Sequence, residues 1–233
     1  MKIIKDEKKI KRYSMFGQVA SLGGLVILAG GMFISFRYPG MIGLAWLALL
    51  IGFVLSQVGI FFGNRWGRRP RPDEHLDNAL KGMDDRNTIY HYKTATNHLL
   101  VGPSGVWVLL PRHQVGKITF EKGRFKQKGG GVLQGYLRIF AQEGLGRPDL
   151  ELASEVDAVN KYIKKILPDQ EIPNTQGVIV FTNEKAELDV EGAPIEVVPA
   201  KKLKELIRKK SKEKGLAPAK LQEIQEALPG ETN

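Results

Sequence analysis

The sequence predicts an α/β protein in which an N-terminal transmembrane helical hairpin precedes a domain built on a mixed sheet. Three observations predict this class. Two long runs near the N-terminus contain no ionisable side chain, short strand-like segments follow one another between residues 87 and 128, and helical and buried-strand patterns alternate after residue 147. That succession is typical of an α/β layer with both antiparallel and parallel strands.

The net charge of +10 is concentrated in the first third of the chain. Residues 1–72 hold 11 Lys and Arg against two acidic residues, whereas residues 73–233 hold 24 against 23. The charge balance of the second region therefore gives only weak support for a nucleic-acid partner. The chain has no cysteine, which excludes disulfides and thiolate metal sites.

The two charge-free runs, residues 14–36 and 39–63, each exceed the roughly 20 residues that cross a hydrocarbon core. The turn "RYPG" separates them and contributes only Arg37, whereas the N-terminus (residues 1–13) and the linker (residues 64–72) are rich in Lys and Arg. By the positive-inside rule, we expect a multi-pass protein of the cell membrane with both termini and the following domain in the cytoplasm. The lipid bilayer is then a predicted partner of the chain. A buried hairpin of a soluble protein is the alternative.

Small residues recur at helical spacing in both runs, which lets helix backbones approach closely. They either pack the two spans against each other or form the interface of a homo-oligomer. The residues concerned are Gly23, Gly24, Gly30 and Gly31 in the first run and Ala48, Gly52, Ser56, Gly59 and Gly63 in the second.

The remaining elements follow in order. Residues 72–83 predict a short helix, residues 87–102 two strands, residues 105–110 a third strand, and residues 116–127 a further hairpin. The Gly-rich residues 129–147 fit no element, and we expect a loop at 129–131. Residues 147–168 predict an amphipathic helix with Leu152, Val156, Val159 and Ile163 on one stripe. Residues 177–183 predict a buried strand, residues 195–200 another strand, and residues 201–215 and 218–228 two helices.

Several of these segments resemble the nuclease-related domain (NERD) family, which has a restriction-endonuclease-like fold. The resemblance rests on "ALKGM" at the end of the first helix, "NHLLVGPSGVWVL", the following "GKI", the long helix after Pro148, and "GVIVF". It covers most of residues 73–210, leaving residues 211–233 as a C-terminal helix and tail. It implies a restriction-endonuclease-like mixed sheet.

The resemblance also implies where catalytic residues would lie. Family members with a complete site carry an aspartate before the second strand and a Glu-x-Lys on the third, and the carboxylates hold a divalent metal ion. By position these places hold Asn97, Leu110 and Arg112, with Pro111 between the last two. Leucine cannot ligate a metal, and the Asn carbonyl is a weak ligand for a hard cation. We therefore expect no catalytic residue, metal or cofactor there. We also expect the strand to end or bulge at Pro111.

Other residues could rebuild a metal site. Asp73, Glu74 and Asp77 lie on the first helix of the domain, and Glu121 lies one strand further on. Two of these would have to converge. Three histidines, His91, His98 and His113, are a second set of potential ligands.

Two basic segments allow both a binding role and a merely solvated surface. Charge alternates with Phe125 in the predicted hairpin, as in a nucleic-acid groove. The helix after residue 200 could contact anionic lipid headgroups. The candidate contact residues are Lys122, Arg124, Lys126 and Lys128 in the hairpin and Lys201, Lys202, Arg208 and Lys209 in the helix.

The sequence thus predicts a membrane-anchored cytoplasmic domain that lacks the usual metal-binding carboxylates and acts as a non-catalytic binding or scaffold module for an unknown protein partner. The alternative from another class is an active metal-dependent nuclease with a relocated site. A third possibility is a structural membrane protein whose domain only mediates assembly.

Overall fold

The computed structural model describes residues 1–128, 144–168, 175–213 and 215–230. The loop expected at residues 129–131 lies outside them. The chain divides into two compact units, a helical unit of residues 7–71 and a sheet unit that combines residues 1–6 with the described residues from 72 to 128 and from 145 onwards.

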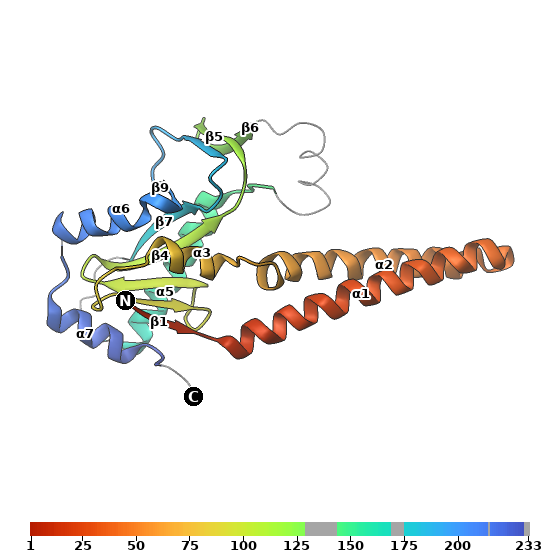
Figure 1. Cartoon of the computed structure of the whole chain (residues 1–233), viewed down its shortest axis with the longest axis horizontal. Helices are drawn as coiled ribbons and strands as arrows, with labels where there is room; N and C mark the ends of the chain where they lie inside the picture. The colour runs from red at the N-terminus through yellow and green to blue at the C-terminus, as the bar shows by residue number, and fades with distance from the viewer. Residues whose placement is uncertain (129–143, 169–174, 214, 231–233) are drawn as a thin grey trace. The chain divides into compact units, whose positions relative to one another are not determined.

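The helical unit consists of two long helices that run side by side (Figure 1). α1 (Glu7–Arg37) leads through the short 3-10 turn η1 (Pro39–Met41) into α2 (Ile42–Phe62), which ends in the π-helical turn η2 (Gly63–Gly67). Both helices are long and apolar enough to cross a membrane. Large apolar side chains point outward along them, among them Val26, Phe36 and Trp46, which are 71%, 82% and 69% exposed. The prediction of two long apolar helices is confirmed.

Small residues form the contact between α1 and α2. A Cβ atom added at Gly52 would lie 2.8 Å from the Leu28 side chain, and one added at Gly24 would lie 2.9 Å from the Gly52 carbonyl oxygen. At Gly59 it would lie 2.6 Å from the Ser21 nitrogen. At these positions only glycine permits this helix separation. The small residues there pack the two helices against each other, whereas a Cβ atom at Gly30 or Gly63 would meet nothing within 4 Å. A homo-oligomer through them stays a prediction.

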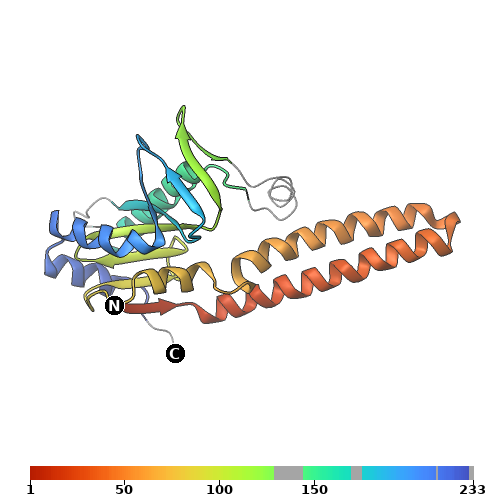
Figure 2. The same ribbon diagram turned by 45° about the horizontal axis from the view of Figure 1, so that its top comes forward.

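The sheet unit contains a six-stranded mixed sheet in the order β1-β2-β3-β4-β7-β9 (Figures 1 and 2). Strands β2, β3 and β4 are antiparallel, whereas β1 is parallel to β2, and β7 is parallel to both β4 and β9. The strands are β1 (Lys2–Lys5), β2 (Thr88–His91), β3 (His98–Gly102), β4 (Gly105–Arg112), β7 (Gln176–Phe181) and β9 (Glu196–Pro199). A second, three-stranded sheet has the order β6-β5-β8, from β5 (Gly116–Glu121), β6 (Arg124–Lys128) and β8 (Ala186–Asp189).

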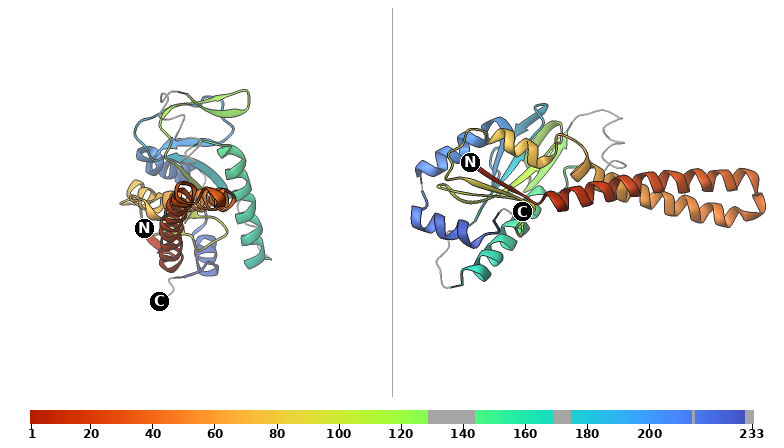
Figure 3. Two further views of the ribbon diagram at one scale, coloured as in Figure 1. Left: turned by 90° about the vertical axis from the view of Figure 1, so that its right-hand side faces the viewer. Right: turned by 60° about the horizontal axis from the view of Figure 1, so that its bottom comes forward.

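Helices cover both faces of the larger sheet. On what we term the α5 face, alternate β4 residues such as Val108 pack against Leu152 and Val159 of α5 (Pro148–Ile166), and α7 (Pro218–Ala227) joins the same core. On the opposite α3 face, Trp107 and Leu109 pack against α3 (Pro72–Ala79) and α6 (Ala200–Glu213). Figure 3 shows the ribbon of the chain from two further sides. The predicted α5 stripe and the predicted buried strand β7 are both confirmed.

The structure differs from the sequence prediction in two additional strands and in the end of one predicted strand. β1 and β8 were not predicted. The expectation that the third strand ends or bulges at Pro111 is wrong, because β4 continues to Arg112 in register with β7. β4 pairs with β3 only from Gly105 to Val108. Pro111 therefore has a neighbouring strand on one side only, which is the edge-like position where a missing N–H is tolerated.

The packing of the helical unit predicts that Gly52→Leu destabilises the hairpin by about 1 to 3 kcal/mol, because the new side chain overpacks the contact with α1. Gly30→Leu is the matched control, since a Cβ atom there meets nothing within 4 Å. Thermal unfolding of the detergent-solubilised chain measures the difference. Equal melting temperatures for the two variants would contradict the close packing at Gly52.

Candidate functional site

Six polar or aromatic side chains gather in the interior of the α3 face, and we call them the α3 cluster. The Lys5 ammonium lies between two carboxylates of α3, 3.0 Å from Asp73 Oδ2 and 2.5 Å from Asp77 Oδ2. Asp73 is fully buried. The members are Lys5, Asp73, Asp77, His91, Tyr92 and His98.

The backbone explains why these residues meet. β1 runs parallel to β2 with Lys5 opposite His91. Ile4 belongs to the core of the α5 face, so strand alternation directs Lys5 to the α3 face. Asp73 and Asp77 are four residues apart on α3 and therefore share one face of the helix.

Two histidines extend the cluster across the hairpin. His91 and His98 are cross-strand partners, and their Nδ1 atoms are 2.8 Å apart. His91 Nε2 lies 3.0 Å from Asp77 Oδ1 and donates to that carboxylate. Two facing ring nitrogens form a hydrogen bond only if one of them carries the proton. Asp77, His91 and His98 therefore form one hydrogen-bonded chain.

Tyr92 completes the cluster through an unusual backbone conformation. Its φ is +64°, in the left-handed region that a bulky side chain rarely adopts. This conformation breaks the strand alternation after His91 and brings the Tyr92 ring to 5.0 Å from the His98 ring. Its hydroxyl donates to Asp73 at 3.5 Å. A costly backbone conformation that persists in the interior indicates a region fixed by its surroundings.

The protonation states of the α3 cluster follow from its contacts. Burial alone would raise the pKa of Asp77, but hydrogen bonds from His91 and Lys5 outweigh burial and lower it. Burial would likewise lower the pKa of Lys5, but its bonds to Asp77 and Asp73 raise it instead. The lysine and Asp77 are therefore both charged at neutral pH, and the ammonium occupies the place between the carboxylates that a cation would need.

The predicted relocated metal site is only partly assembled. Asp73 and Asp77 converge, but on an ammonium group. Glu121 lies in the three-stranded sheet, where hydrogen bonds from Lys128 and then Lys126 lower its pKa to about 2. Glu74 lies on α3, half-buried. Within the described residues, no group of three or more His, Asp or Glu is arranged to hold a metal ion.

The three candidate histidines lie in two separate places. His91 and His98 meet within the α3 cluster, whereas His113 is exposed beyond the end of β4. The three do not converge on one point.

The positions that match the family's catalytic residues lie on the α5 side of the sheet. Leu110 is buried in that core, 4% exposed. Arg112 forms an ion pair with Glu151 of α5. Asn97 donates to Glu155 of the same helix at 3.4 Å, and the Thr96 hydroxyl also bonds Glu155. The structure thus brings Asn97 and Arg112 to one helix, through two glutamates one turn apart.

The basic hairpin candidates lie on β6, except Lys122, which lies in the turn between β5 and β6. Lys126 and Lys128 are 3.2 and 2.5 Å from the Glu121 carboxylate, while Lys122 and Arg124 are exposed. Phe125 is buried and packs against Phe120 with ring centroids 5.0 Å apart. Its ring is therefore not exposed for base stacking, which favours a solvated hairpin over a nucleic-acid groove.

Comparison with known proteins adds no assignment, since no family model, curated protein or solved structure matches this chain. Asp73, Asp77, His91 and His98 were predicted as candidates from the sequence, whereas Lys5, Tyr92, Thr96, Glu151 and Glu155 were not. The four-residue spacing of Asp73 and Asp77 was the sequence signal that pointed to this site. No sequence signal pointed to Lys5, because its positive charge was attributed to the basic flank that sets membrane topology.

We predict that Lys5→Met lowers the free energy of unfolding of the sheet unit by about 3 kcal/mol, because it leaves two buried carboxylates without their cation. Lys2→Met, on the same strand and exposed, is the control and should change it by less than about 0.5 kcal/mol. Urea unfolding of the full chain in detergent measures both. Adding Asp73→Asn and Asp77→Asn to Lys5→Met should recover part of the loss. A Lys5 variant as stable as the Lys2 variant would show that the ion pairs contribute nothing.

Proposed function

We propose that the chain is a membrane-anchored module whose cytoplasmic domain has no nuclease chemistry and serves as a binding or scaffold module for a protein partner. One observation carries the proposal. The positions corresponding to the catalytic residues of nuclease-related domains are used for internal contacts, with Leu110 in the α5-face core and Arg112 paired with Glu151.

The electrostatics of the other carboxylates support the same conclusion. Metal-dependent hydrolysis needs oxygen ligands that converge on an open position for a divalent ion. Here Asp73 and Asp77 bind Lys5, Glu151 binds Arg112, and Glu121 binds two lysines. Asp73, Asp77, Glu151 and Glu121 are thus each paired with a cation of the chain itself.

The nuclease-related frame is part of this proposal. Its support is the order of elements, α3, then the antiparallel strands β2, β3 and β4, then α5, and then β7 parallel to β4. This is the order on which the sequence resemblance rests.

The proposed location has its own support. The apolar side chains exposed along α1 and α2 would face lipid, since soluble proteins rarely expose such large apolar surfaces. Lys and Arg flank the outer ends of the hairpin, and only Arg37 lies at its turn. The positive-inside rule then places the turn outside and the sheet unit in the cytoplasm.

The first test is a nuclease assay. We expect the purified full chain to leave DNA and RNA intact with magnesium or manganese, because without a carboxylate pair open to a metal ion the attacking water keeps its ordinary high pKa. Product analysis on gels, with a chelator control, measures this. Metal-dependent cleavage that is lost on Asp73→Asn or Glu155→Gln would contradict the proposal and establish an enzyme.

The second test is membrane topology. Reporter fusions at Pro39 and at the C-terminus should give opposite signals, because two crossings place the turn and the end of the chain on different sides. A glycosylation or phosphatase reporter measures the side of each fusion. Identical signals from the two positions would rule out the hairpin.

A further inference from the structure

We propose that the exposed face of α6 binds anionic lipid headgroups on the cytoplasmic surface of the membrane in which α1 and α2 are anchored. This inference rests on the proposed membrane anchoring. The ligand chemistry is the phosphate-bearing surface of an anionic bilayer.

The orientation of α6 is fixed by its apolar residues. Leu203 and Ile207 are fully buried in the core of the α3 face. The remaining positions turn a strongly basic surface to solvent, since α6 contains seven Lys and Arg against Glu205 and Glu213. The exposed cations are Lys201, Lys202, Arg208, Lys209 and Lys212.

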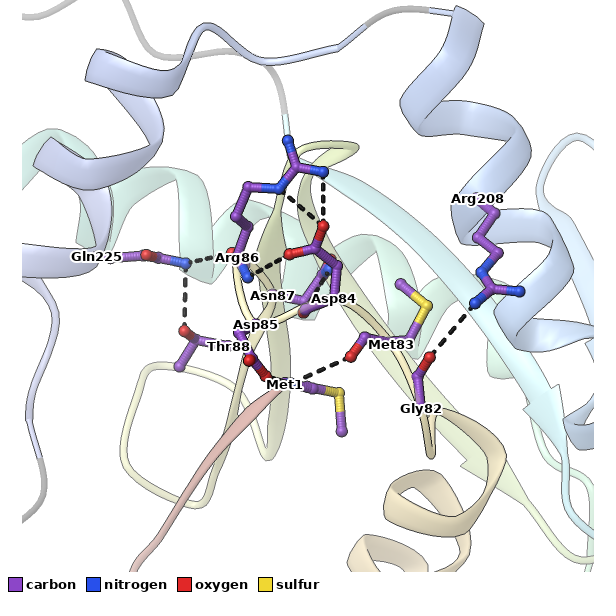
Figure 4. A network of polar contacts seen from close by, with 10 residues as sticks. All are labelled: Met1, Gly82, Met83, Asp84, Asp85, Arg86, Asn87, Thr88, Arg208 and Gln225. Atoms are coloured by element: carbon purple, nitrogen blue, oxygen red, sulfur yellow. Dashed lines mark hydrogen bonds and ion pairs between the residues drawn. The ribbon is translucent and has the colours of Figure 1, made fainter.

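Contacts with the chain after α3 hold this basic face in place. Lys204 Nζ donates to the Lys81 carbonyl at 2.7 Å, and Arg208 donates to the Gly82 carbonyl at 3.3 Å (Figure 4). Glu213 is shared by Lys209 and Lys210, at 3.7 Å each, and Lys210 also pairs with Glu196. Glu213 thus neutralises positive charge near the end of the helix, whereas positive charge is in excess along the rest of α6.

Hollows flank the same cations on both sides of α6. One of about 500 Å³ is lined by Lys201, Lys204, Glu205, Arg208, Lys209 and Lys212. Another of about 530 Å³ lies towards Arg86 and is lined in part by Arg208, Ser211 and Lys212. Arg208 and Lys212 border both hollows, so a phosphate group on either side would meet the same two cations.

The chain connections limit how far the sheet unit can lie from the bilayer. α1 begins at Glu7, directly after the sheet unit, and its charge-free run begins at Ser14. Seven helical residues span about 10 Å. Such a tether keeps the start of the sheet unit within reach of a surface potential that decays over about 8 Å at physiological salt. A basic surface of the unit that comes this close to anionic lipid is attracted to it.

Nucleic acid fits this face less well. Binding to single strands combines cations with aromatic side chains on which bases stack. α6 contains no aromatic residue. The basic hairpin of β5 and β6 is also a weaker candidate than α6, because Glu121 neutralises two of its lysines.

The expected effect is measurable. Each Lys or Arg near an anionic surface strengthens binding about fivefold, so removing three lysines should shift the ratio of docked to undocked protein about 100-fold. The variant is Lys201→Gln, Lys209→Gln and Lys212→Gln, which leaves Lys204 and Arg208 in their backbone contacts. The control is Lys161→Gln, Lys164→Gln and Lys165→Gln, three exposed lysines of α5 on the opposite face of the sheet.

The chain has no cysteine, so a single introduced one can carry a fluorescent donor. The full chain with Ser211→Cys is reconstituted in nanodiscs of phosphatidylcholine, with or without phosphatidylglycerol, and energy transfer to headgroup-labelled lipid is measured. We expect transfer to increase with phosphatidylglycerol, to fall with added salt, to drop in the α6 triple variant and to persist in the α5 control. A donor at Ser154→Cys on α5 should show no increase.

Transfer that is independent of phosphatidylglycerol in an embedded chain would overturn the lipid contact. So would unchanged transfer in the α6 triple variant, or a face that instead binds added DNA or RNA through the same three lysines. A chain that fails to enter nanodiscs would instead contradict the proposed anchoring, so the two failures are distinguishable.

Discussion

The ion pairs of Lys5 with Asp73 and Asp77 are the interaction on which the sheet unit depends, because they join the strand that precedes the helical hairpin to the helix that follows it. Closing a flexible loop as long as residues 7–71 would cost about 4 kcal/mol in chain entropy. The helical unit reduces that cost, since its two ends are already held together, with the Tyr13 and Trp66 rings 5.1 Å apart. The folded hairpin therefore brings β1 and α3 close together, and the ion pairs then hold them in contact.

The same principle explains how buried carboxylates are stabilised in the sheet unit. A buried carboxylate must be neutralised, and a metal ion, an ammonium or a guanidinium can do so. In the sheet unit this cation is Lys5, which pairs with Asp73 and Asp77. An internal cation needs no ion from solution and leaves no position for water or phosphate. The electrostatic requirement that favours metal binding in an enzyme is met here by the fold itself.

Much of the fold could be predicted from the sequence because the signals were long and local. The charge-free runs, the α5 stripe and the apolar run of β7 each extend over several turns or residue pairs. β1 could not be predicted, since four residues show little periodicity and its partner β2 lies more than 80 residues further along the chain. Only part of the α3 cluster could be predicted from the sequence. Helical spacing pairs Asp73 with Asp77, but the meeting of His91 with His98 depends on a register set by the connection between β2 and β3.

The ion pair of Lys5 with Asp77 also differs from a pH switch. A carboxylate with a lowered pKa contributes stability that is lost only as pH falls through its folded value, below the ordinary 3.8 for Asp77. A lysine with a raised pKa contributes stability that is lost only as pH rises through its folded value, above the ordinary 10.5 for Lys5. Between these limits Lys5 and Asp77 are both charged. The charges of the basic surface of α6 face solvent, so salt screens them more strongly than it screens this buried ion pair.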